Sequence, residues 1–286
     1  MTETPKLPDQ TRVRALTLTV HDRAALTSYY THALGFEVLR QEGGAVVLGA
    51  PDAPILTLVE DRAAQRPARA TGLYHFAVLL PTRADLGRWL GYAIRADVPL
   101  QGASDHLVSE AIYLADPEGN GIEIYRDRPR DEWPRANGGV AMDTLALDAQ
   151  GVIEAGRGVP WTRMPVGTRL GHMHLQVSDI PAAEAFYRDL LGFDLMARYG
   201  TQASFLAAGG YHHHIGVNTW GTRGAPPAPQ GSLGLRDYVI ILPDQPAWEA
   251  LRARIEAAEL PTSSLDARRF QAADPAGNRI VFEVEG

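Results

Sequence analysis

The hydrophobic positions follow the same order four times along the chain. An apolar, β-rich stretch is followed by a stretch with a helical period of about 3.6 residues and then by two or three shorter apolar stretches. The first apolar stretches read ALTLTV after Arg14, LYHFAVLLP from Leu73, LGHMHLQVSD from Leu170 and LRDYVIILPD from Leu235. Repetition of a whole supersecondary unit is a strong indication of a repeat architecture. The pattern predicts an α+β fold of four βαβββ modules.

Helix signals and turns place the modules. The stretches AALTSYYTHALGF and PAAEAFYRDLLGF end at Gly35 and Gly192, and further helices are expected from about Arg83 to Ala96 and over AWEALRARIEAAEL. The second and fourth modules share an Asp-Pro-x-Gly-Asn turn, at Asp116 and at Asp274. The predicted modules are 14–60, 72–126, 170–220 and 235–286. They give a first domain over 10–127 and a second over 169–286, with a connector over 128–168 that has room for a short helix around 144–155.

Composition narrows the class of protein. The chain has 286 residues, 45% of them hydrophobic, which is enough for two globular domains. Its net charge is -7 and it has no basic run, so nucleic acid is a poor partner. No apolar stretch reaches the roughly 18 residues of a membrane span, and the N-terminus has no apolar export segment. Together with the absence of cysteine, this favours the cytoplasm.

The chain lacks thiolate ligands, so any metal must be held by carboxylates and by some of the nine histidines. The most informative stretch is SDHLVSEAIYLADPEGNGIEIY, from Ser104 to Tyr125. Turn residues between two β-rich segments predict a hairpin, with Tyr113 on one strand and Glu123 on the next. A carboxylate between two isoleucines either faces solvent on a one-sided sheet or points into a polar cavity and binds a ligand.

Four such modules, with Leu-Gly-Phe closing the first helix of each half, resemble the vicinal oxygen chelate superfamily. It includes glyoxalase I, bleomycin-resistance proteins and extradiol dioxygenases. The spacing His106, Tyr113, Asp-Pro, Gly and Glu123 is similar to the extradiol dioxygenase signature, and the chain looks most like the bacterial catechol 2,3-dioxygenase group. The resemblance implies two cup-shaped mixed sheets and an Fe(II) site, with Mn(II) as the alternative, held by two histidines and one carboxylate.

By resemblance, Glu123 is the carboxylate ligand and His75 is a histidine ligand, while His106 and Tyr113 donate hydrogen bonds to the oxygens of a bound catechol. The third ligand requires a choice between modules. The first strand of module one offers Ala15 and Thr17, whereas alignment of LYHFAVLLP with LGHMHLQVS puts His172 opposite His75.

We therefore expect modules two and three to pair with each other, and modules one and four likewise. A domain-swapped dimer with the ordinary pairing would give the same cup. Module four has Asp237, Gln271 and Val281 where module two has His75, Tyr113 and Glu123. The cup formed by modules one and four is therefore expected to hold no metal.

His212, His213 and His214 are expected on the last strand of module three, where alternation would direct His213 to the opposite side from its two neighbours. A histidine near the metal of extradiol enzymes carries a proton during catalysis, and His214 is the predicted residue, with His212 as the alternative. The expected reaction inserts O₂ into a catechol-type ring outside the diol and gives a muconic semialdehyde.

Two other functions stay open. One is a glyoxalase-like isomerase or transferase with Zn or Ni, and the other is a metal-free binder of small molecules such as an antibiotic. The sequence does not define which diol is the substrate, and it leaves the oligomeric state open, a homo-oligomer included.

Overall fold

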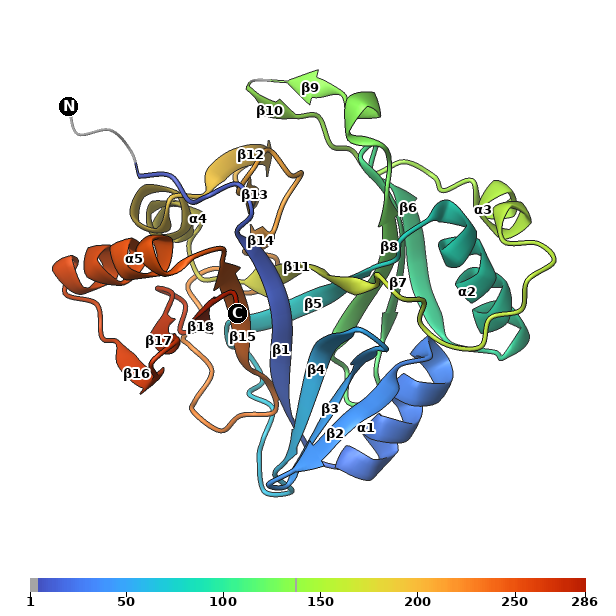
Figure 1. Ribbon diagram of the computed structural model, residues 1–286, viewed down its shortest axis with the longest axis horizontal. Helices are drawn as coiled ribbons and strands as arrows, with labels where there is room; N and C mark the ends of the chain where they lie inside the picture. The colour runs from blue at the N-terminus through green and yellow to red at the C-terminus, as the bar shows by residue number, and fades with distance from the viewer. Residues whose placement is uncertain (1–4, 137) are drawn as a thin grey trace. The chain divides into compact units, whose positions relative to one another are not determined.

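A computed structural model describes residues 5–136 and 138–286 and contains four copies of the predicted module (Figure 1). Module one comprises β1 (Arg12–Val20), α1 (Arg23–Tyr29), the π-helix η1 (Tyr30–Leu34), β2 (Glu37–Glu42), β3 (Ala45–Ala50) and β4 (Ala53–Glu60). Module two comprises β5 (Gly72–Leu79), α2 (Arg83–Arg95), β6 (Leu100–Asp105), β7 (Ser109–Ala115) and β8 (Gly121–Asp127).

The second half of the chain repeats this order. Module three comprises β11 (Arg169–Gln176), α4 (Ile180–Glu184), the π-helix η3 (Ala185–Leu191), β12 (Asp194–Tyr199), β13 (Ala203–Ala207) and β14 (Ile215–Asn218). Module four comprises β15 (Gly234–Leu242), α5 (Gln245–Ala257), β16 (Ser263–Asp266), β17 (Arg269–Ala273) and β18 (Arg279–Val284). The connector holds η2 (Arg130–Glu132), β9 (Arg135–Ala136), β10 (Gly139–Val140) and α3 (Ala149–Ala155).

The strands form two mixed sheets of eight strands each, in the orders β16-β17-β18-β15-β1-β4-β3-β2 and β12-β13-β14-β11-β5-β8-β7-β6. The predicted fold class is therefore confirmed. The first sheet contains the strands of modules one and four, and the second contains those of modules two and three. The pairing inferred from the missing histidine of module one is confirmed as well.

Residue contacts divide the chain into two compact units. The first unit consists of residues 18–64 and 75–171, and the second consists of the residues up to Thr17, 65–74 and 172–286. In the first unit α3 of the connector lies alongside α2 (Figure 1). A Cβ on Gly87 of α2 would lie 1.9 Å from the Val152 carbonyl oxygen of α3, so the two helices can approach this closely only because glycine stands there.

The Asp-Pro-x-Gly-Asn turns are structural elements. Asp116 accepts hydrogen bonds from the backbone of Glu118 and Asn120 and from the Tyr30 hydroxyl, the last at 2.7 Å. In the second unit, Asp274 is bound in the same way by Tyr187 at 2.9 Å. Burial raises the pKa of Asp116, although the hydrogen bonds of Asn120 and Tyr30 act to lower it. Each turn thus fixes the helix of one module to the last strand of the next.

Two details differ from the expectation. The first helices of modules one and three end as π-helices rather than continuing as α-helices. The run His212–His214 lies before β14, which starts only at Ile215, so its predicted position on the strand is wrong. Gly209 and Gly210 both have positive φ angles, 60° and 64°, and this turn delays the start of the strand.

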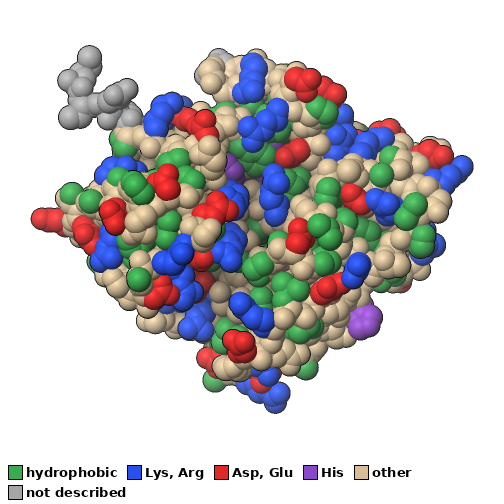
Figure 2. All heavy atoms as spheres, viewed as in Figure 1, with side chains coloured by type: hydrophobic (Ala, Val, Ile, Leu, Met, Phe, Trp, Pro, Cys, Tyr) green, Lys and Arg blue, Asp and Glu red, His purple; other side chains and the backbone are tan. Residues whose placement is uncertain are grey.

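Lys and Arg side chains are interspersed with Asp and Glu side chains over the face shown in Figure 2. Within residues 5–136 and 138–286, no helix is long and apolar enough to cross a membrane.

Candidate metal centre

In the first unit, three strands bring the predicted site residues to one sheet face. In the parallel pair β5–β8, Ala77 lies opposite Glu123, and in the antiparallel pair β7–β8, Tyr113 lies opposite Glu123. His75 precedes Ala77 by two residues and therefore shares its face. The result is a pair in which His75 Nε2 lies 3.0 Å from Glu123 Oε2.

Burial decides between the two interpretations of Glu123. Its neighbours Ile122 and Ile124 are buried and, by alternation, belong to the opposite face, whereas Glu123 is itself only 3% exposed. Its own face carries the buried apolar residues Ala77, Leu79, Ala111 and Tyr125. The solvent-facing interpretation is therefore wrong. A buried carboxylate among apolar side chains is costly unless it is paired or binds a cation.

His106 and Tyr113 lie next to this pair. The Tyr113 hydroxyl lies 2.6 Å from His106 Nε2, and the ring centroid of Tyr113 lies 5.7 Å from that of His75. On the other side of the His106 ring, Nδ1 lies 2.7 Å from the backbone carbonyl oxygen of Asp143. Contacts therefore run from the backbone carbonyl of Asp143 in the connector through His106 and Tyr113 to His75.

In the second unit, β11 carries His172 and His174, both buried. In the parallel pair β11–β14, His174 lies opposite Gly216, and a Cβ at Gly216 would lie 3.0 Å from the His174 ring. The rings of Tyr74 and Trp220 lie 5.1 and 5.6 Å from that of His174. His174 is therefore packed in an aromatic environment.

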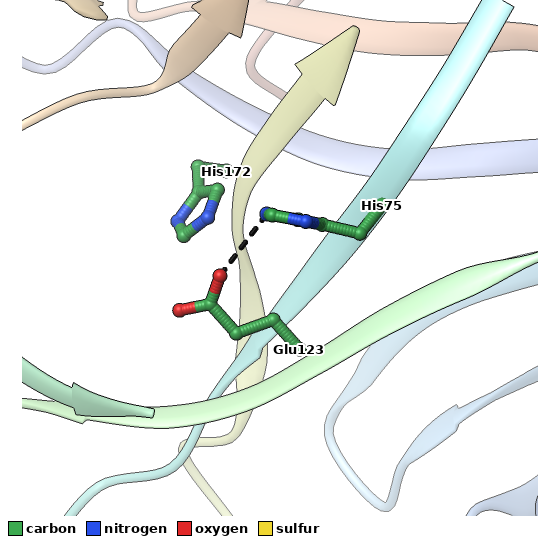
Figure 3. Close-up of side chains that lie close together, drawn as sticks. All are labelled: His75, Glu123 and His172. Carbon is green, nitrogen blue, oxygen red and sulfur yellow. Dashed lines mark ion pairs between the residues drawn. The ribbon is translucent and has the colours of Figure 1, made fainter. Parts of the chain in front are cut away.

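Three side chains offer ligand atoms at one point. One ligand atom each from His75, Glu123 and His172 lies within 4.8 Å of the others, and all three residues are buried. Figure 3 shows the side chains, which come from β5, β8 and β11, directed toward one another. These are the three residues predicted as metal ligands.

Their geometry and chemistry fit a metal of the expected class. His75 Nε2 lies 3.0 Å from Glu123 Oε2, so a ring nitrogen and a carboxylate oxygen are close enough together to bind one ion. Two imidazoles and one carboxylate form the donor set of non-haem Fe(II) oxygenases, which leaves other positions open.

The strand register explains why modules three and four do not repeat the set. In module four, Val281 lies opposite both Val239 and Gln271, as Glu123 lies opposite Ala77 and Tyr113. Val281 and Gln271 therefore occupy the positions of Glu123 and Tyr113, as the sequence alignment predicted. Asp237, at the position of His75, has its pKa raised by burial. In module three the same two positions are held by Gly216 and Phe205.

His212 and His213, the first two of the three consecutive histidines, lie at different distances from His172. The ring centroid of His213 lies 4.0 Å from that of His172, and that of His212 lies 6.2 Å away. His214 lies 4.8 Å from the Tyr211 ring, and its Nδ1 accepts a hydrogen bond from the Ala208 backbone at 3.2 Å. The sequence predicts His214, because strand alternation would direct His213 away from its two neighbours, but the three histidines lie in a loop before β14.

The fold is that of a protein of duplicated βαβββ modules, and it carries a buried cluster of three side chains that could hold a metal ion. Residues 12–124 and 169–282 match the family model described as Glyoxalase/Bleomycin resistance protein/Dioxygenase superfamily, so the chain belongs to this superfamily.

Among known proteins, the chain is 40% identical over 282 residues to a protein of Bacillus subtilis (strain 168) named catechol-2,3-dioxygenase. The match covers 96% of this chain and 98% of that protein.

Solved structures show the same fold. A putative dioxygenase from Bacillus subtilis has a TM-score of 0.68 at 14% identity, covering 98% of this chain and 86% of that one. Glyoxalase I from Zea mays has a TM-score of 0.58 at 17% identity, covering 96% of this chain and 92% of that one. The fold is therefore shared by proteins with different activities, and function must be argued from the site.

Proposed function

We propose that this chain is an extradiol ring-cleaving dioxygenase that holds Fe(II), or alternatively Mn(II), on His75, Glu123 and His172. Its substrates are a catechol-type aromatic diol and O₂, and its product is a muconic semialdehyde. The observation that carries the proposal is the buried group of two imidazoles and one carboxylate within 4.8 Å of one another. The relative that is 40% identical over nearly the whole chain, and is named catechol-2,3-dioxygenase, supports the same reaction.

The residues have separate roles in this proposal. His75 and His172 ligate through neutral ring nitrogens, and Glu123 supplies a single negative charge, so that a catecholate can bind without excess negative charge at the metal. The bound ion would supply Lewis acidity and a route for electrons from the ring to O₂. Apolar side chains beside Glu123, among them Ala77 and Tyr125, exclude water from this face.

Proton transfer is the task of a histidine beside the site. His214 is the residue that the sequence favoured, and His213 is added by its distance of 4.0 Å from the His172 ring. His106 and Tyr113 interact with the oxygens of the diol. Separate His213→Gln and His214→Gln variants would show which imidazole moves the proton, since only the loss of that one should slow turnover at unchanged iron content.

The test loads the purified chain with Fe(II) without oxygen, adds a catechol and air, and follows the yellow ring-opened product. Glu123→Ala is expected to lose bound iron and activity together. Because loss of a residue that only orients a ligand costs about 10–100-fold, loss of the carboxylate ligand should cost more than about 100-fold in activity.

Glu283→Ala is the matched control. Glu283 is the carboxylate of β18, two residues from Val281, and its partner is Arg14. It should keep the iron and the activity. A Glu123→Ala protein that retains stoichiometric iron would remove Glu123 from the ligand set, and an iron-loaded wild-type protein that cleaves no catechol would refute the dioxygenase reaction.

A further inference from the structure

The connector contributes to the site although it lies outside the two stretches that match the family model. β6 is the last strand in the order of its sheet. Its final residue, Asp105, exchanges two backbone hydrogen bonds with Leu145 of the connector, with N–O distances of 3.0 and 2.9 Å. The connector thus forms one antiparallel bridge on the open edge of β6, one residue before His106.

The turn that carries His106 is held in an unusual conformation. Leu107 has a φ angle of 68°, in the left-handed region that a leucine rarely adopts. Asp105 stabilises this turn, because its Oδ1 accepts the Leu107 amide at 2.8 Å and its Oδ2 accepts Arg128 at 2.5 Å. The His106 amide donates to the Ser109 carbonyl oxygen at 2.9 Å. A strained turn persists only where its surroundings impose it.

The same connector segment fixes the ring of His106. The Asp143 carbonyl oxygen, 2.7 Å from Nδ1, can only accept a hydrogen bond, so the proton of a neutral ring must be on Nδ1. Nε2 then has no hydrogen and accepts from the Tyr113 hydroxyl at 2.6 Å. The hydroxyl hydrogen of Tyr113 is therefore directed at His106, and the oxygen presents its lone pairs to other groups.

We propose that residues Asp143–Leu145 of the connector are positioning residues that set the tautomer and orientation of His106, and through it the donor direction of Tyr113. The consequence for ring cleavage rests on the proposed function, whereas the tautomer does not.

The test measures the ring nitrogens of His106 by two-bond ¹H–¹⁵N correlation NMR of ¹⁵N-labelled protein, with the His106 signals identified by their loss in His106→Gln. The wild-type ring should show a protonated Nδ1 and an unprotonated Nε2. Leu145→Pro removes the amide that donates to Asp105, and it should shift His106 toward the Nε2–H form or a mixture. Displacement of a catalytic group by about 1 Å should also lower kcat/KM about 100-fold at unchanged iron content.

Leu145→Ala is the control, because it keeps the amide and removes a side chain that is 46% exposed. Its His106 signals should match those of wild type. If Leu145→Pro does not fold, Asp143→Gly replaces it, since this change removes the Asp143 carboxylate bound to the Thr144 amide and frees the carbonyl to move. A wild-type ring with Nε2–H, or a folded Leu145→Pro protein with an unchanged ring, would overturn the proposal. Both outcomes are measured by NMR and do not require catechol cleavage, so failure of this proposal can be distinguished from failure of the proposed function.

Discussion

Gly171 directly precedes His172 on β11, and its replacement by alanine tests how tightly the candidate ligand is held. A Cβ built on Gly171 would lie 1.8 Å from Tyr125 Oη and 2.7 Å from its Cζ. Tyr125 is fully buried two residues beyond Glu123, so its ring cannot swing into solvent. An approach below 3.0 Å is essentially never observed, so the two groups must separate by at least 1.2 Å, the difference between 3.0 and 1.8 Å.

That displacement predicts two measurable losses. Overpacking of a buried site costs about 1–3 kcal/mol. At roughly 2–4 °C per kcal/mol for a chain of this size, the melting temperature should fall by about 2–12 °C. Because a ligand or catalytic group misplaced by about 1 Å costs about 100-fold, iron affinity and ring cleavage should fall by about that factor.

Gly102→Ala is the matched control, because it is also a strand glycine but has no atom within 4 Å of the added Cβ. Its stability should stay within about 0.5 kcal/mol of wild type. The measurements are thermal unfolding, iron content after anaerobic loading and the rate of catechol cleavage. If Gly171→Ala were to match Gly102→Ala in all three, the reasoning that Tyr125 and β11 constrain His172 would be refuted.

Two further predictions concern stability. Glu110 is buried and forms ion pairs with Arg83 and Arg126. Glu110→Gln should therefore leave the two arginine charges poorly compensated and lower the free energy of unfolding, measured in urea, by about 3–5 kcal/mol. A loss below about 1 kcal/mol would contradict this role. The pKa of Glu184 is lowered, chiefly by its hydrogen bonds with Arg198 and also by Ser204. Its contribution is therefore present above the unfolded pKa of about 4.5 and is lost as the pH falls through the lower folded value. Urea titrations between about pH 5 and 3 should show a smaller loss of stability on acidification for Glu184→Gln than for wild type, and equal slopes would show that the pair is not formed in solution.

Local patterns predicted the modules because they depend on neighbours in sequence. The Asp-Pro-x-Gly-Asn turns are stabilised mainly by Asp116 and Asp274 binding their own following residues, so they could be placed from the sequence. The histidine run could not. Strand alternation predicts which way these histidines face, but Gly209 and Gly210 have positive φ angles and form a turn before the strand begins. The sequence alone does not determine which of its many conformations a glycine adopts.

The connector shows a similar limit. Its contact with His106 uses the backbone carbonyl of Asp143, and every residue has such a group, so no side-chain pattern could have indicated it. The π-helical ends of the first helices in modules one and three were missed as well. There Tyr30 and Tyr187 bind aspartates 86 and 87 residues away, and such distant partners do not appear in a local helical period.

The sequence by itself determined the four modules, the hairpin of Tyr113 and Glu123, and the histidines that stand at equivalent positions in modules two and three. Only the tertiary structure decided that the β8 carboxylate is buried, that the His213 ring lies beside that of His172, and that the connector reaches His106. The physical reason is the separation along the sequence over which each kind of interaction acts. Alternation and turn chemistry act between residues close in the chain, whereas a metal ligand set and a ring tautomer depend on atoms that meet only after strands from distant parts of the chain have paired.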